Sequence, residues 1–139
     1  MRRWNFGGAM TGAVVAALLA GLPARAESTL TSVHFAAGQS SAKVEGALVR
    51  GDSAIYSFAA NAGQTADIAI TSLEDNASFT IYQPPAHVTH SDDGLDVDGS
   101  PAAADTRQWQ AALPASGAYY VEVGGDRGNA TYTLTIAVK

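Results

Sequence analysis

The segment just before the C-terminal lysine constrains the fold most, because apolar and hydroxyl side chains alternate strictly along it. Threonine occupies positions 131, 133 and 135, and the positions between and after them carry Tyr132, Leu134, Ile136 and Val138. A period of two with β-branched residues is typical of a strand buried on one face, whereas a helix would distribute these apolar residues around its circumference. The sequence therefore predicts a half-buried β-strand at the end of the chain.

Shorter stretches of the same alternation precede it, and glycine, asparagine, aspartate and proline separate them. These stretches are Val33 to Phe35, Ala42 to Val49, Tyr56 to Phe58, Ile68 to Ile70, Phe79 to Ile81, Trp109 to Leu113 and Tyr119 to Val123. No segment after residue 26 has sustained helical periodicity. About eight short strands with such spacing predict an all-β protein, an antiparallel β-sandwich with a jelly-roll-like arrangement.

One stretch, residues 83–105, lacks a strand pattern. It contains a proline pair, two histidines and the aspartates at positions 92, 93, 96 and 98. We expect a long acidic loop here, and loops of this length inside a small domain are often functional. The alternative is a surface excursion without function, since long loops cost little closure entropy.

The first 26 residues have the pattern of a secretory signal. Arg2 and Arg3 precede an apolar run over residues 13–20, and Ala24-Arg25-Ala26 offers small residues at the positions that a signal peptidase reads. The apolar stretch is shorter than the roughly 20 residues that span a bilayer. We therefore expect cleavage after Ala26, a periplasmic location, no remaining membrane anchor and one mature domain over residues 27–139.

The net charge and the absence of cysteine exclude several classes of function. The full chain has 8 basic and 13 acidic residues, and loss of the signal would leave five basic against thirteen acidic residues, a formal charge of −8. An acidic domain does not suit nucleic-acid binding, which needs a basic face. The chain has no cysteine, which excludes disulfides and thiol chemistry, so stability has to come from buried apolar surface.

Three blocks of sequence resemble the bacterial periplasmic inhibitors of goose-type (g-type) lysozyme. The blocks are Val33 to Ala42, with its Phe-x-x-Gly-x-Ser-Ser-Ala run, Tyr56 to Gln64, with Tyr-x-Phe and Ala-x-Ala-Gly-Gln, and Leu113 to Tyr119. The same blocks are similar to the wider bacterial pre-peptidase C-terminal domain, a β-sandwich attached to many secreted enzymes. The resemblance covers most of residues 33–82 and 109–138.

The resemblance implies a non-catalytic protein that inhibits goose-type lysozyme by inserting loops from one end of the sandwich into the active-site cleft. It implies a partner-binding site made of Ser116, Gly117, Tyr119, Asp126 and Arg127. Lysozyme inhibitors of several kinds present a Ser-Gly-x-Tyr loop, which Ser116 to Tyr119 match. The loop before the last strand is shorter than in those inhibitors and carries one arginine, Arg127.

Each of these residues also has a purely structural interpretation. Pro114 and Gly117 could simply set a hairpin turn, with Tyr119 packing inward beside Val121. Arg127 suits a two-pronged contact with a partner's carboxylate, but it could equally form an exposed pair with Asp126, which would contribute little.

The sequence gives only weak signals for metal binding or catalysis. The aspartates of residues 92–98 invite a calcium hypothesis, but their spacing does not match an EF-type loop, and His87 and His90 lack a third zinc ligand. No nucleophile motif is present, so we expect no enzyme activity, metal or cofactor. The alternative function is a pre-peptidase-type module that binds a polysaccharide or a secreted protein.

Overall fold

The computed structural model describes residues 28–139, and within them the alternating segments form strands. The strands are β1 (Ser28–Ser32), β2 (Ser41–Leu48), β3 (Ser53–Ala60), β4 (Thr65–Ser72), β5 (Ala77–Tyr82), β6 (His87–Ser91), β7 (Gly94–Asp98), β8 (Pro101–Thr106), β9 (Gln108–Ala112), β10 (Gly117–Gly125) and β11 (Ala130–Val138). No helix is assigned in this range, and hence none that could cross a membrane. The predicted signal sequence lies outside the described residues.

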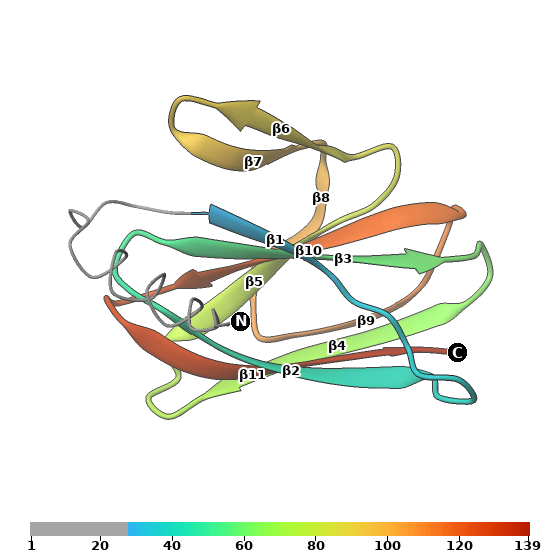
Figure 1. Ribbon diagram of the computed structural model, residues 1–139. Helices are drawn as coiled ribbons and strands as arrows, with labels where there is room; N and C mark the ends of the chain where they lie inside the picture. Colours follow the sequence, from blue (N-terminus) through green and yellow to red (C-terminus); the bar gives the residue numbers. More distant parts are fainter. Residues whose placement is uncertain (1–27) are drawn as a thin grey trace, which may run out of the picture.

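Two sheets face each other, with strand orders β1-β3-β10-β5-β8 and β2-β11-β4-β9 (Figure 1). The chain changes sheet at almost every step between β2 and β11, except from β5 to β8. With β1 and the β6–β7 hairpin set aside, eight strands remain, and their two orders are those of a jelly roll. All pairs are antiparallel apart from β1 with β3. The predicted all-β sandwich is confirmed.

The core fills the space between the two sheets. Alternate residues of β3, β4, β5, β10 and β11 point inward, which is the reason for the period of two in the sequence. Among the most deeply buried are Ile68, Phe79, Ile81, Val121, Leu134 and Ile136. Because both ends of each strand are fixed by this packing, the turns at the two ends of the sandwich are held in defined positions.

A close contact inside the core depends on a glycine. Tyr56 and Tyr132 share a buried hydrogen bond of 2.6 Å between their hydroxyl oxygens. Burial, and then this hydrogen bond, raise the pKa of Tyr132. Gly46 lies opposite Tyr132 in the β2–β11 ladder, and a Cβ atom there would come within 2.5 Å of the Tyr132 hydroxyl oxygen. The tyrosine pair therefore requires a residue without a side chain at position 46.

The expectation of a long loop over residues 83–105 is wrong. This segment forms the β6–β7 hairpin and the edge strand β8. Asp92 and Asp93 make a two-residue turn, and Gly94, with φ of 115°, pairs with Ser91 across it. The aspartates that suggested a loop are thus turn and surface-strand residues, and only Val97 of the hairpin is deeply buried. A hairpin with one buried residue leaves little hydrophobic pattern to detect.

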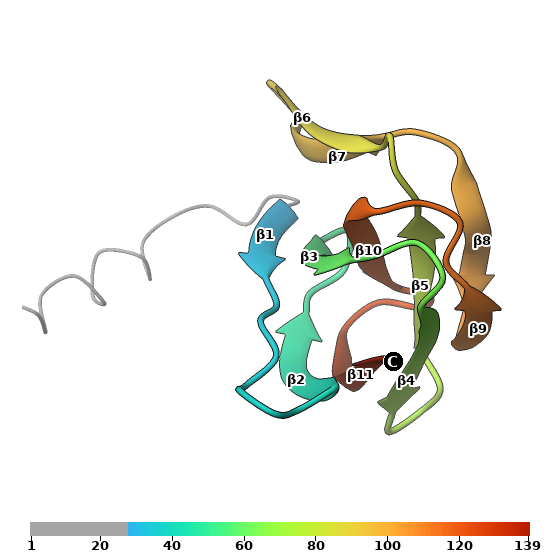
Figure 2. The ribbon, with the colours of Figure 1, turned by 90° about the vertical axis from the view of Figure 1, so that its right-hand side faces the viewer.

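The hairpin lies over the outer face of the five-stranded sheet, on the side away from the four-stranded sheet (Figure 2). Strand β7 contacts β1 there. On β3, Ile55 alternates with the core residues Ala54 and Tyr56 and so faces outward, yet it is completely buried. The outer face of this sheet is therefore partly covered by β1 and the hairpin.

The first strand also differs from the prediction. We expected a strand over Val33 and Phe35, but β1 ends at Ser32, and these two residues follow it. The Val33 amide still donates to the Ser57 carbonyl at 2.8 Å, and both side chains pack on the core. The apolar pair is inside, but it is held by the connection between β1 and β2 rather than by a strand.

Replacing Gly46 with alanine tests the packing of the core. We expect Gly46→Ala to lower the free energy of unfolding by about 1–3 kcal/mol, because the added methyl group displaces the Tyr132 ring. Gly124→Ala is the matched control, since Gly124 is also in a strand but no atom lies within 4 Å of the position that a Cβ atom would occupy there. Urea unfolding of both variants measures the difference, and equal stabilities would contradict this account of the Tyr56–Tyr132 contact.

Candidate functional site

The Ser116–Gly117 turn leads into β10 at one end of the sandwich. The Ser116 hydroxyl oxygen accepts a hydrogen bond of 2.9 Å from the Ala62 amide, which ties this turn to the β3–β4 turn. Gly117 has φ of 143°, and a side chain there would press on Pro84 at 3.2 Å. Both residues are exposed. We call this region, formed by residues 61–64 and 114–117, the serine end.

Tyr119 cannot contact a partner in this structure, because its side chain is completely buried. Its ring stacks on Phe58 with 5.4 Å between ring centroids. Its hydroxyl donates to the Ala115 carbonyl at 2.6 Å. The prediction that Tyr119 belongs to the binding surface is therefore wrong, and the alternative of inward packing is confirmed. Through its hydrogen bond to Ala115, the buried Tyr119 side chain fixes the backbone of the serine end.

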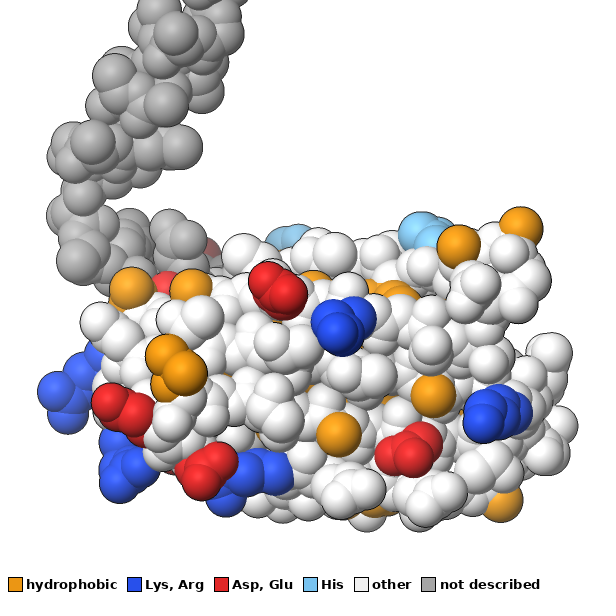
Figure 3. Space-filling model, turned by 90° about the horizontal axis from the view of Figure 1, so that it is seen from below, with side chains coloured by type: hydrophobic (Ala, Val, Ile, Leu, Met, Phe, Trp, Pro, Cys, Tyr) orange, Lys and Arg blue, Asp and Glu red, His pale blue; other side chains and the backbone are white. Residues whose placement is uncertain are grey.

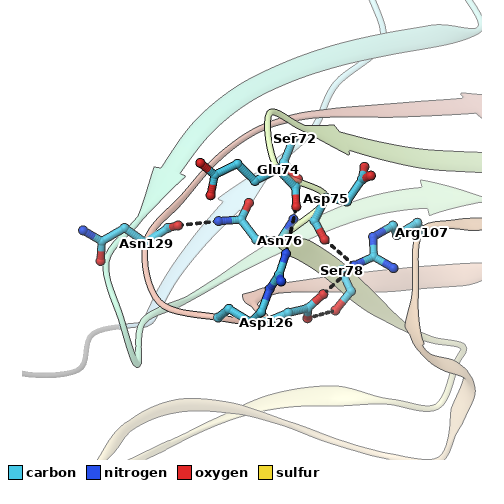
Figure 4. Close-up of polar contacts among 9 residues, drawn as sticks. Ser72, Glu74, Asp75, Asn76, Ser78, Arg107, Asp126 and Asn129 are labelled. Atoms are coloured by element: carbon cyan, nitrogen blue, oxygen red, sulfur yellow. Dashed lines mark hydrogen bonds and ion pairs between the residues drawn. The ribbon is translucent and has the colours of Figure 1, made fainter.

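Asp126 and Arg127 lie in the β10–β11 turn, at the opposite end of β10. Asp126 accepts a hydrogen bond of 2.7 Å from the Ser78 hydroxyl and forms an ion pair of 2.9 Å with Arg107 (Figure 4). The alternative interpretation of Arg127, an exposed ion pair with Asp126, is therefore wrong. Arg127 instead donates to the Glu74 carbonyl at 3.0 Å. Among residues 28–139, no carboxylate lies within ion-pair distance of Arg127.

Asn76 joins the turns around Arg127 into one unit. Its side-chain amide donates to the Asn129 carbonyl at 2.6 Å, and its own carbonyl accepts from the Asp126 amide at 2.7 Å. The Asn129 side chain in turn accepts from the Arg50 amide at 2.9 Å. These bonds link the β2–β3, β4–β5 and β10–β11 turns. We call residues 49–52, 73–76 and 126–129, together with Arg107, the arginine end.

The structure separates the predicted site into two. Ser116 and Gly117 lie at the start of β10, whereas Asp126 and Arg127 follow its last residue. Eight residue steps along a strand cover roughly 26 Å. The expectation that these residues form one inserting surface is wrong, because the central strand places them at opposite ends of the sandwich. Each end is a separate candidate.

Basic side chains gather at the arginine end. Figure 3 shows Lys and Arg side chains gathered at the left of the molecule, the end with the β10–β11 turn, with Asp and Glu side chains between them. Arg50, Arg107 and Arg127 are located there by the bonds described above. Sequence reasoning selected only Arg127. Arg107 and Asn76 were missed, because their bonding partners, Asp126 and Asn129, lie in a turn that is distant in the sequence.

A second polar cluster lies on the outer face of the five-stranded sheet, where the Tyr82 hydroxyl is 3.5 Å from a Glu122 carboxyl oxygen. Partial burial, and then the nearby Asp96 carboxylate, raise the pKa of Glu122, although the Tyr82 hydrogen bond acts in the opposite direction. Burial, and then Glu122, raise the pKa of Tyr82. Three elements contribute: β5, β7 and β10. The Asp96 carboxylate of the β6–β7 hairpin therefore interacts electrostatically with Glu122 of the five-stranded sheet.

The hairpin itself offers little support for metal binding. His87 and Asp98 are 3.5 Å apart across it, and both side chains are mostly exposed, so the pair adds little stability. Within residues 28–139, no group of three or more His, Asp or Glu side chains is arranged to hold a metal ion.

The chain is similar to one protein family and to several solved structures. The family model of the bacterial pre-peptidase C-terminal domain matches residues 52–125, from the turn before β3 to the end of β10. The crystal structure of Aeromonas hydrophila PliG, a periplasmic lysozyme inhibitor of g-type lysozyme, is 30% identical, and the match covers 82% of this chain and 100% of that chain with a TM-score of 0.64. No curated protein sequence gives a significant match.

Two further PliG structures are similar. A mutant of the Escherichia coli protein is 25% identical, covering 81% of this chain and 99% of that chain, with a TM-score of 0.57. Salmonella Typhimurium PliG is 26% identical, covering 80% of this chain and 98% of that chain, with a TM-score of 0.57. The likeness therefore extends over the whole sandwich of these proteins.

The Glu122 cluster predicts a pH dependence of stability. A carboxyl group whose pKa is raised on folding stabilises the fold below its ordinary pKa, and that contribution is lost as the pH rises through the raised value. We therefore expect wild type to lose stability relative to Glu122→Gln as the pH rises above about 4, the ordinary range of a glutamate. Asp96→Asn, which removes the neighbouring charge, should reduce this loss. Urea unfolding at each pH tests it, and a pH-independent difference between wild type and Glu122→Gln would contradict it.

Proposed function

This chain belongs to the bacterial pre-peptidase C-terminal domain family and is related to the PliG proteins, and on that basis we propose that it inhibits g-type lysozyme in the periplasm. The observation that carries the proposal is the 30% identity that extends over the entire length of Aeromonas hydrophila PliG. The signal-like first 26 residues agree with export to that compartment. The proposed role requires no catalysis by this chain, and the named relatives are inhibitors rather than enzymes.

The arginine end is the surface that we propose to enter the lysozyme cleft. Glycosidases act with acidic side chains that flank the scissile bond, so a plug benefits from a cation at its leading edge. The Arg127 guanidinium gives one hydrogen bond to the Glu74 carbonyl and, among the described residues, has no carboxylate partner within ion-pair distance. Its remaining N–H donors suit a two-pronged bond to a carboxylate.

Rigidity is the second argument for this end. Binding costs free energy whenever flexible loops have to be ordered, and a preformed surface avoids much of that cost. The Asn76 and Asp126 hydrogen bonds already fix the turns around Arg127. The serine end is also braced, but its Ser116 hydroxyl is neutral and already accepts a bond from Ala62. A carboxylate would gain less there than from a guanidinium.

Single substitutions at the two ends distinguish them. We expect Arg127→Ala to raise the inhibition constant for a g-type lysozyme at least about 10-fold, since charge-assisted contacts at interface centres reach that size. Arg127→Lys should recover only part of the loss, because lysine cannot form the two-pronged bond. Ser116→Ala is the control from the opposite end and should leave inhibition unchanged. The measurement is the rate of cell-wall lysis against inhibitor concentration.

Opposite results are equally informative. Loss of inhibition with Ser116→Ala and none with Arg127→Ala would move the binding surface to the serine end. No slowing of lysis by micromolar wild-type protein would remove the proposed function altogether. Thermal melting of each variant excludes unfolding as the cause, since neither side chain is buried and their removal should change stability little.

Salt should weaken the interaction through its association rate. The mature chain carries a formal charge of −8, so its field would attract a cationic enzyme, and that field is screened within about 10 Å at 0.1 M salt. We expect the association rate constant, measured by surface binding, to fall as salt rises, while the dissociation rate constant changes less. A rate that is independent of salt would contradict steering by the acidic body.

A second candidate is a module that binds a neutral glycan. A shallow groove of about 260 Å³ lies beside the serine end, and its lining includes Phe35, Tyr120, His34 and Ser57. Aromatic faces with hydroxyls at their edges suit a sugar ring. Retention of the protein by insoluble peptidoglycan in the absence of lysozyme, and its loss in Tyr120→Ala, would favour this function.

A further inference from the structure

Leu73 is an unusual residue for the surface of this protein. Its side chain is 95% exposed, the highest value among the exposed large hydrophobic residues of the described chain; Val49 follows at 54% and Leu30 at 45%. A single exposed leucine is ordinary in itself. Leu73, however, lies in the β4–β5 turn of the arginine end, and Val49 begins the neighbouring β2–β3 turn. The two most exposed of these three side chains thus occur at one end of the molecule.

The turn that carries Leu73 is braced on both sides. The residue before it, Ser72, accepts bonds from the Asp75 amide at 3.3 Å and, through its hydroxyl oxygen, from the Asn76 amide at 2.9 Å. The carbonyl of the residue after it, Glu74, accepts the bond from Arg127. Arg107 donates to the next carbonyl, that of Asp75. The backbone of Leu73 is therefore fixed while its side chain is left in solvent.

Leucine at such a position exposes apolar surface without any contact inside the chain to compensate for it. A rigid turn with an apolar side chain at its apex needs little ordering when that side chain enters a pocket, so nearly all of the burial contributes to binding. Beside Leu73 the surface is hollowed between the turn and β11, over Thr71, Thr131 and Thr133. The Leu73 side chain could enter a pocket of a partner protein, while the hollow beside it receives a projecting side chain of that partner.

We infer that Leu73 is the apolar anchor of the arginine end, and that the partner is a protein whose cleft has an apolar subsite flanked by carboxylates. This inference rests on the proposed function and adds an apolar contact to the charged contact of Arg127. Leu73 and Arg127 are joined through the Glu74 carbonyl, so the anchor and the guanidinium enter together. Hot spots of protein interfaces lie near the centre in fully desolvated pockets; leucine is less common among them than Trp, Tyr or Arg, and Leu73 is singled out by its exposure on a braced turn.

Charge favours a protein partner over a membrane. The turn carries Glu74 and Asp75 next to Leu73, and the chain as a whole is acidic. An anionic lipid surface would repel it, and one leucine is a weak membrane anchor. In a protein cleft the two acidic side chains can remain at the solvated rim, while the arginines face carboxylates of the partner.

The test compares leucines in two places. Leu73→Ala should weaken inhibition of a g-type lysozyme, and its direct binding, at least about 10-fold, the effect expected when a buried leucine is truncated at an interface. Leu73→Met retains apolar volume and should restore most of the affinity. Leu30→Ala makes the same chemical change at another exposed leucine, which lies opposite Ile55 in the edge strand β1 and outside the arginine-end turns, and it should have no effect. All variants should have the same melting temperature as wild type.

Each outcome decides a separate question. Inhibition by wild type that is unchanged in Leu73→Ala overturns the anchor and leaves the proposed function standing. Wild type that neither binds nor slows the lysozyme overturns both. Equal losses in Leu73→Ala and Leu30→Ala overturn a localised anchor. Leu73-dependent binding to phosphatidylglycerol vesicles, with inhibition unaffected, would assign Leu73 to a lipid surface and overturn the inference as well.

Discussion

The length of the central strand β10 determines how this protein can meet a partner. β10 pairs with β3 on one side and β5 on the other, so it is fixed along its whole course, and its nine residues separate the serine end from the arginine end. A central strand that is hydrogen-bonded on both sides does not bend to bring its ends together. The turns of the serine end and those of the arginine end therefore cannot enter one cleft. Any account of inhibition has to select one end.

The arginine end combines a backbone braced by hydrogen bonds with an exposed guanidinium and an exposed leucine. Asp126 is held by Ser78 and Arg107; Asn76 joins its turn to the β4–β5 turn, and Asn129 joins it to the β2–β3 turn. This network uses the carboxylate of Asp126 internally, and within residues 28–139 it leaves the Arg127 guanidinium with one hydrogen bond, to the Glu74 carbonyl. An inhibitor that performs no chemistry depends on such preorganisation, because affinity is what remains after the cost of ordering has been met. The serine end is equally rigid but presents neither a cation nor an apolar projection.

Sequence patterns predicted the sandwich well, because inward-facing residues of a two-sided core alternate, as Leu134 and Ile136 do. The β6–β7 hairpin was missed because a single buried valine, Val97, carries no periodicity. Its turn residues Asp92, Asp93 and Gly94 were present but were interpreted as a loop. The Asp126–Arg107 pair could not be predicted, since it joins two turns through the folded structure. Leu73 gave no signal either, because exposure cannot be seen in a sequence when a leucine occurs next to a strand.

The structure of a complex with a g-type lysozyme is the most direct test of the account. We predict that the turns at 73–76 and 126–129 enter the substrate cleft, with the Arg127 guanidinium on a carboxylate of the enzyme and Leu73 in an apolar subsite. A complex in which the turn at 114–117 occupies the cleft, or in which the cleft remains open, would contradict it.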